Sequence, residues 1–166
     1  MKKEKIELGE LMLVGLTART NNANEMNPNT SKIGALAGSY WESQVANGFQ
    51  NRTNPGVTYS IYTEYESDEH GEYTYFIGEV VVSLDNQDLS QFQTLVIPKS
   101  SYQKFTTAPG EIPNIVISSW QEIWGMNESD FGGRRQYIAD FEVYDERAQN
   151  PNAAVIDIYI GIRDGG

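Results

Sequence analysis

The chain has no cysteine and only one histidine, His70, among its 166 residues. Without thiols it forms neither disulfides nor thiolate metal sites, so the redox state of its compartment stays open. His70 lies in a polar turn, which excludes a histidine-based catalytic triad and a multi-histidine metal site. A nucleophile elbow, a phosphate-binding glycine loop and a dinucleotide fingerprint are also missing. We therefore predict a protein that is not an enzyme and that uses no cofactor and no metal.

Basic residues are scarce: the chain has 12 lysines and arginines and 23 acidic residues, which gives a net charge of −11. The pI is near 4.4. Binding to a phosphate backbone depends on lysine and arginine, so this balance argues against direct nucleic-acid binding. It argues equally against an anionic membrane surface. The charge favours cationic partners, although solubility alone explains it as well.

Long hydrophobic runs are absent as well. The apolar run Leu11 to Leu16 is too short and too interrupted for a signal peptide or a membrane-spanning helix. We expect a cytoplasmic protein whose residues 1–166 form one domain of ordinary size.

Aromatic residues are plentiful, with 10 Tyr, 6 Phe and 3 Trp. Alternating and helical periodicities predict an order of strand, helix, strand, strand that occurs twice. The first set comprises a strand at 11–16, a helix at 33–47, and strands at 57–64 and 73–84. The second comprises extended segments at 95–97 and 102–106, a helix at 112–124, and strands at 134–144 and 154–162. Pro28 suits a helix start and Gly48 a helix end.

The recurring order indicates an internal duplication, with repeat 1 at about 8–84 and repeat 2 at about 94–163. A shift of 78 residues aligns three pairs, namely Tyr59 with Tyr137, Glu64 with Glu142, and Glu79 with Asp157. We therefore predict an α+β fold of two antiparallel sheets related by a pseudo-two-fold, each covered by a helix. A ligand cleft is expected where the two halves meet.

The stretch Arg134 to Tyr144 carries the most functional information. Read as a strand, it places Tyr137, Ala139, Phe141 and Val143 on a core face and Gln136, Ile138, Asp140, Glu142 and Tyr144 on the other. On this second face a carboxylate lies beside aromatic and aliphatic groups, which suits a receptor for a lipophilic cation. A solvated outer face is the alternative, but it does not require the apolar neighbours. Asp140 is a second, lower-ranked carboxylate.

The remaining aromatic residues leave their roles open. Tyr59 and Tyr62 are as compatible with structural hydrogen bonds as with ligand contacts. Trp41, Trp120 and Trp124 lie on predicted helices, where packing against a sheet is the ordinary role. Any tryptophan that reaches the cleft edge would form an aromatic wall.

Six segments, in order, resemble the gyrase-inhibitor-like, AraC-type effector-binding family in its stand-alone form. They are residues 57–65, residues 71–80, Ile97-Pro98 with 102–105, residues 120–124, residues 139–147 and residues 158–162. The resemblance covers nearly the whole chain, from Leu11 to Arg163. Many relatives attach this domain to a DNA-binding helix-turn-helix. Because the first strand is predicted to start by about Leu11, we expect none here and no direct control of transcription. Action on transcription through a regulatory protein partner stays open, as does a homo-oligomer.

The resemblance implies a cleft that binds small molecules, often lipophilic and cationic, and in which a buried glutamate on a late strand neutralises the ligand. Glu142 matches that glutamate. The predicted ligand-binding residues are Glu142, Tyr144, Asp140, Ile138, Tyr62, Tyr59, Trp120 and Trp124.

Two other functions compete with a small-molecule binder. In the first, the protein is a hydrolase in which Glu142 and a nearby tyrosine activate a water. In the second, it is an acidic protein-interaction module of gyrase-inhibitor type that occupies a basic site on another protein.

Overall fold

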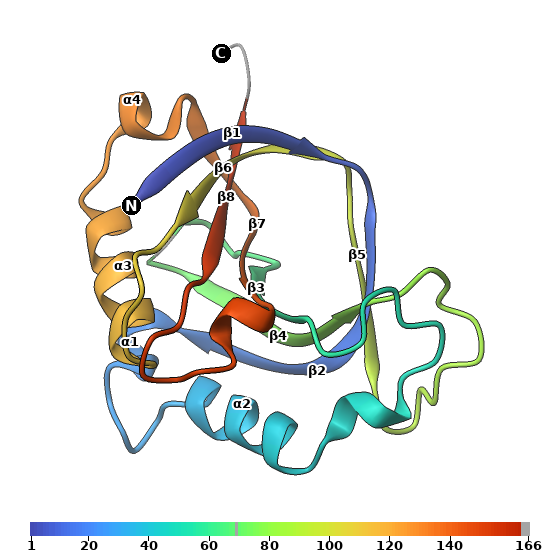
Figure 1. Ribbon diagram of the computed structural model, residues 1–166. Helices are drawn as coiled ribbons and strands as arrows, with labels where there is room; N and C mark the ends of the chain where they lie inside the picture. The colour runs from blue at the N-terminus through green and yellow to red at the C-terminus, as the bar shows by residue number, and fades with distance from the viewer. Residues whose placement is uncertain (69, 164–166) are drawn as a thin grey trace.

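The computed structural model describes residues 1–68 and 70–163 and contains an eight-stranded antiparallel sheet (Figure 1). The strand order is β1-β6-β8-β7-β3-β4-β2-β5. The strands are β1 (Lys2–Leu8), β2 (Leu11–Asn21), β3 (Thr58–Thr63), β4 (Glu72–Val80), β5 (Gln93–Ile97), β6 (Ser100–Thr106), β7 (Arg134–Tyr144) and β8 (Asp157–Arg163).

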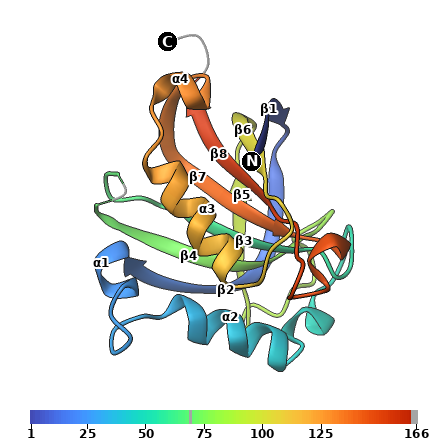
Figure 2. The same ribbon diagram turned by 60° about the vertical axis from the view of Figure 1, so that its left-hand side comes forward.

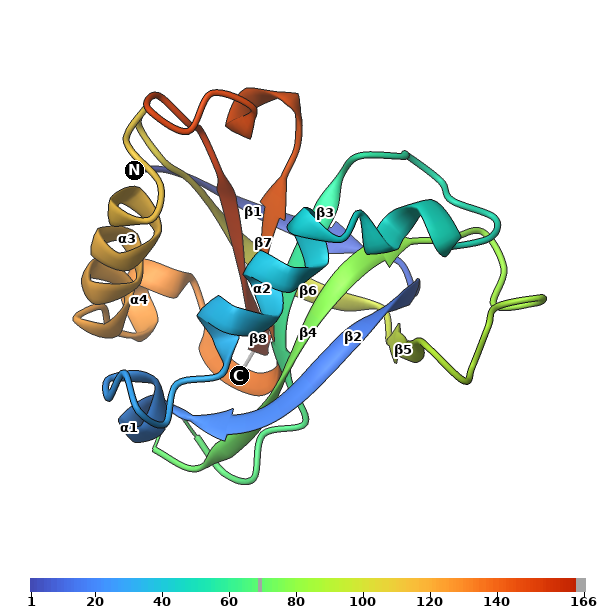
Figure 3. The same cartoon turned by 90° about the horizontal axis from the view of Figure 1, so that it is seen from below.

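Two longer helices cover one face of this sheet, α2 (Ile33–Glu42) and α3 (Asn114–Trp124). In Figure 3, α2 lies in front of the central strands and α3 lies to their left. The shorter helices are α1 (Asn22–Glu25), α4 (Glu128–Phe131) and the 3₁₀ turns η1 (Val45–Gly48) and η2 (Glu146–Ala148). The predicted α+β class is therefore confirmed.

The duplication is visible in the strand order. The first half runs β2, α2, β3, β4 and the second runs β6, α3, β7, β8. In the sheet, β3 pairs with β7 at the centre. Outward from this pair follow β4, β2 and β5 on one side and β8, β6 and β1 on the other. The two expected sheets are thus joined edge to edge into one, because this pairing satisfies the backbone groups of both inner strands.

The constant shift of 78 residues is wrong. Ile61 pairs with Phe76 in the first hairpin, and Phe141 pairs with Tyr159 in the second. If the first pair is superposed on the second, Ile61 of β3 corresponds to Phe141 of β7, a shift of 80 residues. Phe76 of β4 then corresponds to Tyr159 of β8, a shift of 83 residues. The hairpin loops of the two halves differ in length, so no single shift relates the halves.

The strand β1 was not predicted, since its sequence KKEKIEL has no sustained apolar face. It pairs with β6, whereas β2, which begins three residues after β1 ends, pairs with β4 and β5. β5 and β6 are likewise separated by two residues. The chain therefore bends sharply at both points, and the sheet curls around its own interior (Figure 1).

Three clusters of buried side chains fill the protein. One lies inside the curl of the sheet and includes Phe76, Tyr102 and Phe141. The other two lie on the helical side, beneath α3 and α2 respectively, where Figure 2 shows the helices against the strands. The helical face is thus buried under each helix separately, and the space between the helices stays available.

Helix boundaries differ from the prediction in physically simple ways. The helix predicted at 33–47 ends at Glu42, because Gln44 adopts a left-handed backbone with φ of 51° before η1 begins. Pro28 does not start it. Instead, the Glu25 carboxylate accepts hydrogen bonds from the backbone N–H groups of Lys32 and Ile33 and satisfies donors that the first turn leaves free. α3 begins at Asn114 rather than at 112 and ends, as predicted, before Gly125.

Candidate functional site

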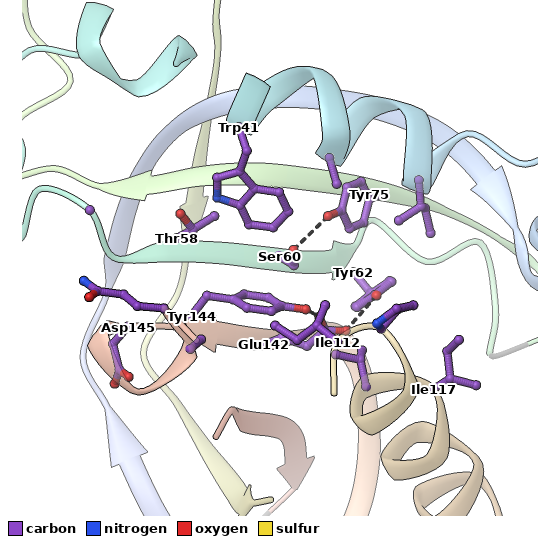
Figure 4. A pocket seen from close by; sticks show the side chains of 17 residues that line it. Trp41, Thr58, Ser60, Tyr62, Tyr75, Ile112, Ile117, Glu142, Tyr144 and Asp145 are labelled. Carbon is purple, nitrogen blue, oxygen red and sulfur yellow. Dashed lines mark hydrogen bonds between the residues drawn. The ribbon is translucent and has the colours of Figure 1, made fainter. Parts of the chain in front are cut away.

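A cavity of about 470 Å³ opens between α2, α3 and the central strands β3 and β7 (Figure 4). Its walls are mainly apolar and aromatic. It is lined by Ile33, Ala37, Trp41, Gly56, Thr58, Ser60, Tyr62, Tyr75, Ile112, Pro113, Val116, Ile117, Glu142, Tyr144, Asp145, Ala148 and Gln149. A cavity of this size and character, with a few polar groups, suits a small organic molecule.

Glu142 lies at the centre of this cavity and is 2% exposed. Three side chains donate hydrogen bonds to its carboxylate. The Tyr62 hydroxyl and the Trp120 indole N–H reach Oε2 at 2.8 and 2.7 Å, and the Tyr144 hydroxyl reaches Oε1 at 2.5 Å. The carboxylate is therefore held in one orientation by neutral donors from β3, α3 and β7.

The charge of Glu142 has no cationic partner among the residues that the structure describes. Burial raises the pKa of Glu142 above its ordinary value, since desolvation disfavours the charged form. The hydrogen bonds from Tyr144, Trp120 and Tyr62 act in the opposite direction and lower this pKa, but burial prevails. Burial also raises the pKa of the Tyr62 and Tyr144 hydroxyls, which therefore stay protonated as donors.

Strand pairing explains why these groups meet. Ser60 of β3 is the register partner of Glu142 on β7, so the two halves of the chain contribute neighbouring side chains to one face. Phe141 and Val143 point to the opposite face and pack in the interior of the curled sheet, as alternation requires. The predicted alternation of faces along Ala139 to Tyr144 is therefore correct, while the ligand-binding role of the second face stays a prediction.

Of the predicted ligand-binding residues, the structure brings four together. Glu142, Tyr144 and Tyr62 line the cavity. Trp120 lies behind them, 9% exposed, and reaches the cavity through its hydrogen bond to Glu142.

The other four predicted residues lie elsewhere. Asp140 is fully buried and forms an ion pair with Arg135, in which Arg135 Nη2 lies 2.7 Å from Asp140 Oδ2. Its carboxylate also accepts a hydrogen bond from the Tyr65 hydroxyl. Tyr59 packs against Phe141 on the opposite face of the sheet, with ring centroids 5.6 Å apart. Trp124 lines a different cavity.

Ile138 is 48% exposed because β7 does not run regularly. Its pairing with β8 shifts between Arg135 and Asp140, and Tyr137 in that interval has φ of 55°. Such an irregularity breaks the alternation of faces. Consequently Ile138 and Tyr137 do not occupy the faces that a regular strand would give them, and Tyr137 stacks on the Arg135 guanidinium at 4.3 Å.

The sequence reasoning did not place Trp41 in the site. Its ring lies at the cavity wall, 46% exposed, and meets the Tyr144 ring edge-on at 5.7 Å. Ile33 and Ala37 line the same wall, so the spacing i, i+4, i+8 along α2 was an available signal. Tyr75, which shares a 2.7 Å hydrogen bond with Ser60 and lines the cavity, was not among the predicted ligand-binding residues.

Two features of the described residues bear on other functions. In residues 1–68 and 70–163, no three His, Cys, Asp or Glu side chains come together as a metal-binding group. None of the helices in that part of the chain combines the length and the apolar character needed to cross a membrane.

The duplicated α+β fold holds a ligand-sized cavity at the junction of its halves, an arrangement that suits the binding of a small molecule. Residues 6–162 match the model of the Cass2 family, described as integron-associated effector binding protein, and the chain belongs to this family. The predicted kinship with effector-binding proteins is therefore confirmed.

Individual relatives agree with this assignment. The chain is 30% identical over 149 residues to "Putative transcriptional regulator protein YobU" of Bacillus subtilis (strain 168). The aligned residues cover 90% of each of the two chains. Among solved structures it resembles the integron cassette protein VCH_CASS2 of Vibrio cholerae, with a TM-score of 0.73, 28% identity, and 97% and 95% of the two chains covered. It also shares its fold with SAV2435, solved bound to tetraphenylphosphonium, at a TM-score of 0.72, 17% identity and coverage of 99% and 95%.

Proposed function

We propose that this effector-binding protein recognises lipophilic, aromatic cations in the cavity between α2 and α3, with Glu142 as the counter-charge. The observation that carries the proposal is a buried carboxylate that three neutral donors orient and that no cation neutralises among the described residues. A buried charge without a partner is costly, so a bound cation supplies what the free protein lacks.

The aromatic walls fit the same ligand class. Trp41, Tyr144, Tyr62 and Tyr75 present ring faces and edges around the carboxylate. Aromatic faces attract cations and also pack against aromatic ligand groups, so they suit an organic cation better than a hydrated metal ion. The tetraphenylphosphonium complex of SAV2435, which shares the fold, supports this choice of ligand class.

We propose binding rather than hydrolysis as the role of Glu142. A carboxylate has about four lone-pair sites, and three donors already occupy sites on this one. This leaves little capacity to take a proton from a water molecule. The orienting hydrogen bonds instead suit a fixed negative charge.

We further propose that ligand binding serves a regulatory response. The regulator name of the Bacillus subtilis relative supports this role, and the acidic surface suits an interaction with a basic partner protein. A partner that binds only in the presence of tetraphenylphosphonium, and not with Glu142→Gln, would link the cavity to that response.

Binding of a permanent cation should weaken as the pH falls. Because burial raises the pKa of Glu142, protons compete with the cation at higher pH than they would for an exposed glutamate. Below the pKa of the free protein, affinity should fall by about tenfold per pH unit, as expected when one proton replaces one cation. Titrations with tetraphenylphosphonium at a series of pH values measure this slope. An affinity that does not change with pH in the wild type, or that changes equally in Glu142→Gln, contradicts the proposal.

Trp41→Ala should weaken aromatic ligands whether or not they carry a charge. The ring forms one wall of the cavity and contacts Tyr144, and an aromatic contact contributes about 0.5–1.5 kcal/mol beyond its buried area. We expect a loss of roughly two- to tenfold for tetraphenylphosphonium and for a neutral arylphosphine oxide alike. Calorimetric titration checks this, with Trp124→Ala as the matched control outside the cavity. Equal effects of the two substitutions would show that Trp41 is not a ligand wall.

A further inference from the structure

A second cavity, of about 600 Å³, lies between the end of α3, α4, the start of β7 and the end of β8. It is lined by Ile123, Trp124, Met126, Asn127, Glu128, Phe131, Arg134, Arg135, Gln136, Tyr137 and Arg163. Three of the 12 basic residues of a strongly acidic chain are therefore gathered around one cavity. Unlike the cavity around Glu142, this one suits a negative charge.

Two of these arginines lie side by side on adjacent strands. Arg134 and Arg163 are direct register partners on β7 and β8. Like charges in directly opposite positions destabilise an antiparallel pair. Arg134 has one ion pair, to Glu128 at 3.2 Å, in which both side chains are largely exposed and the attraction is therefore weak. Arg163 has no ion pair among the described residues. An anion between the two guanidinium groups would relieve their repulsion.

The third arginine carries an unused donor. The Arg135 side chain is 10% exposed, and its Nη2 donates to Asp140 at 2.7 Å. Its Nε is buried without a hydrogen-bond acceptor. An unsatisfied buried donor costs about 1–3 kcal/mol, so an acceptor placed at this N–H would stabilise the protein. Because Asp140 balances the charge of Arg135, what this residue adds to the wall of the cavity is an N–H donor without an acceptor.

The remaining wall of the second cavity is apolar. Trp124 is 52% exposed, and Met126 and Phe131 lie on the same wall. A half-exposed tryptophan beside arginines offers a flat ring for stacking and a cationic rim for a carboxylate. An inorganic anion would contact only the arginines, whereas an aromatic carboxylate would contact both the arginines and the Trp124 ring.

We propose that the second cavity is a binding site for small aromatic carboxylates. The carboxylate lies between Arg134 and Arg163, whose planar guanidinium groups match its two oxygens, and the ring packs on Trp124. The protein then holds two sites of opposite preference, a cation site at Glu142 and an anion site at the end of α3.

Calorimetric titration with naphthoate tests the site. Arg163→Gln and Arg134→Gln should each weaken naphthoate by about tenfold or more, the effect of losing one charge-assisted hydrogen bond. The matched control is Lys99→Gln, which removes one positive charge at an exposed position outside this cavity and should change the affinity little. Neutral naphthalenemethanol should bind more weakly than naphthoate to the wild type.

A second arm locates the ligand. Naphthoate should bind equally well in the presence of saturating tetraphenylphosphonium, and the two arginine variants should bind tetraphenylphosphonium as the wild type does, which also shows that they are folded. No naphthoate binding at millimolar concentration, equal losses in Lys99→Gln and Arg163→Gln, or displacement of naphthoate by tetraphenylphosphonium would each overturn the proposal. The loss of naphthoate binding in the arginine variants does not depend on whether Glu142 binds cations. Circular dichroism shows independently that these variants are folded, so the two proposals can be tested separately.

Discussion

Glu142→Gln is expected to lower the affinity of the protein for tetraphenylphosphonium by about one to two decades. Glutamine keeps the size of the side chain and removes the charge, and a charge-assisted contact in a desolvated site is worth roughly 1.5–3 kcal/mol. The Tyr144 hydroxyl can accept a hydrogen bond from the new amide, while Tyr62 and Trp120 still donate to its oxygen. The shape of the cavity is thus preserved. Tryptophan quenching at neutral pH measures the loss.

Two controls separate the counter-charge from other effects. A neutral arylphosphine oxide should bind the wild type and Glu142→Gln nearly equally, because it does not use the charge. Glu122→Gln removes one negative charge from an exposed position on α3 and should leave tetraphenylphosphonium nearly unchanged. If Glu122→Gln and Glu142→Gln weaken the cation equally, the attraction comes from the overall charge of the chain.

Asp140→Asn is expected to destabilise the fold strongly, although it lies only two residues from Glu142. Asp140 is fully buried and paired with Arg135, and it also accepts from Tyr65 and the Gly161 backbone N–H. Removing its charge leaves the buried guanidinium without a counter-ion, a loss of about 3–5 kcal/mol in the free energy of unfolding. Urea denaturation followed by tryptophan fluorescence measures it.

The comparison variants for this prediction are Glu72→Gln and Glu142→Gln. Glu72 pairs with Arg19 at 3.6 Å and both side chains are about half exposed, so its loss should cost less than about 1 kcal/mol. Glu142→Gln removes a buried charge that has no partner, so above the raised pKa of Glu142 it should leave the stability unchanged or increase it. If all three variants have the same stability, Asp140 is not the structural carboxylate that its contacts indicate.

These two carboxylates show how far the sequence could predict the site. Alternation along 139–144 correctly separated Phe141 and Val143 from Glu142 and Tyr144, since a regular strand fixes facing by position. The same alternation placed Asp140 with Glu142 but could not reveal Arg135 as its partner. That contact depends on the irregular backbone around Tyr137, for which the sequence holds no clear signal.

The fold was predictable to the extent that it depends on local pattern. The two halves, their element order and the end of α3 before Gly125 follow from periodicity and from the glycine after the helix. The joining of both halves through β3 and β7 is a long-range pairing, and register between distant strands is not encoded in either strand alone. β1 was missed for a related reason, because an exposed edge strand does not need an apolar face.

The aromatic wall was predictable in part. Trp120 was included and meets Glu142, whereas Trp124, four residues later on the same helix, lines the other cavity. Trp41 was left out although it lines the cavity around Glu142. Sequence spacing gives the face of a helix, but which face points at a cavity depends on how the helices pack on the sheet.

A crystal structure of the complex with tetraphenylphosphonium tests the central claim most directly. We predict that the ligand lies between α2 and α3, that its rings contact Trp41 and Tyr144, and that its phosphorus lies within about 6 Å of the Glu142 carboxylate, the range over which opposite charges act strongly on each other. A ligand bound outside this cavity, or a Glu142 carboxylate turned away from the cation, would contradict the account.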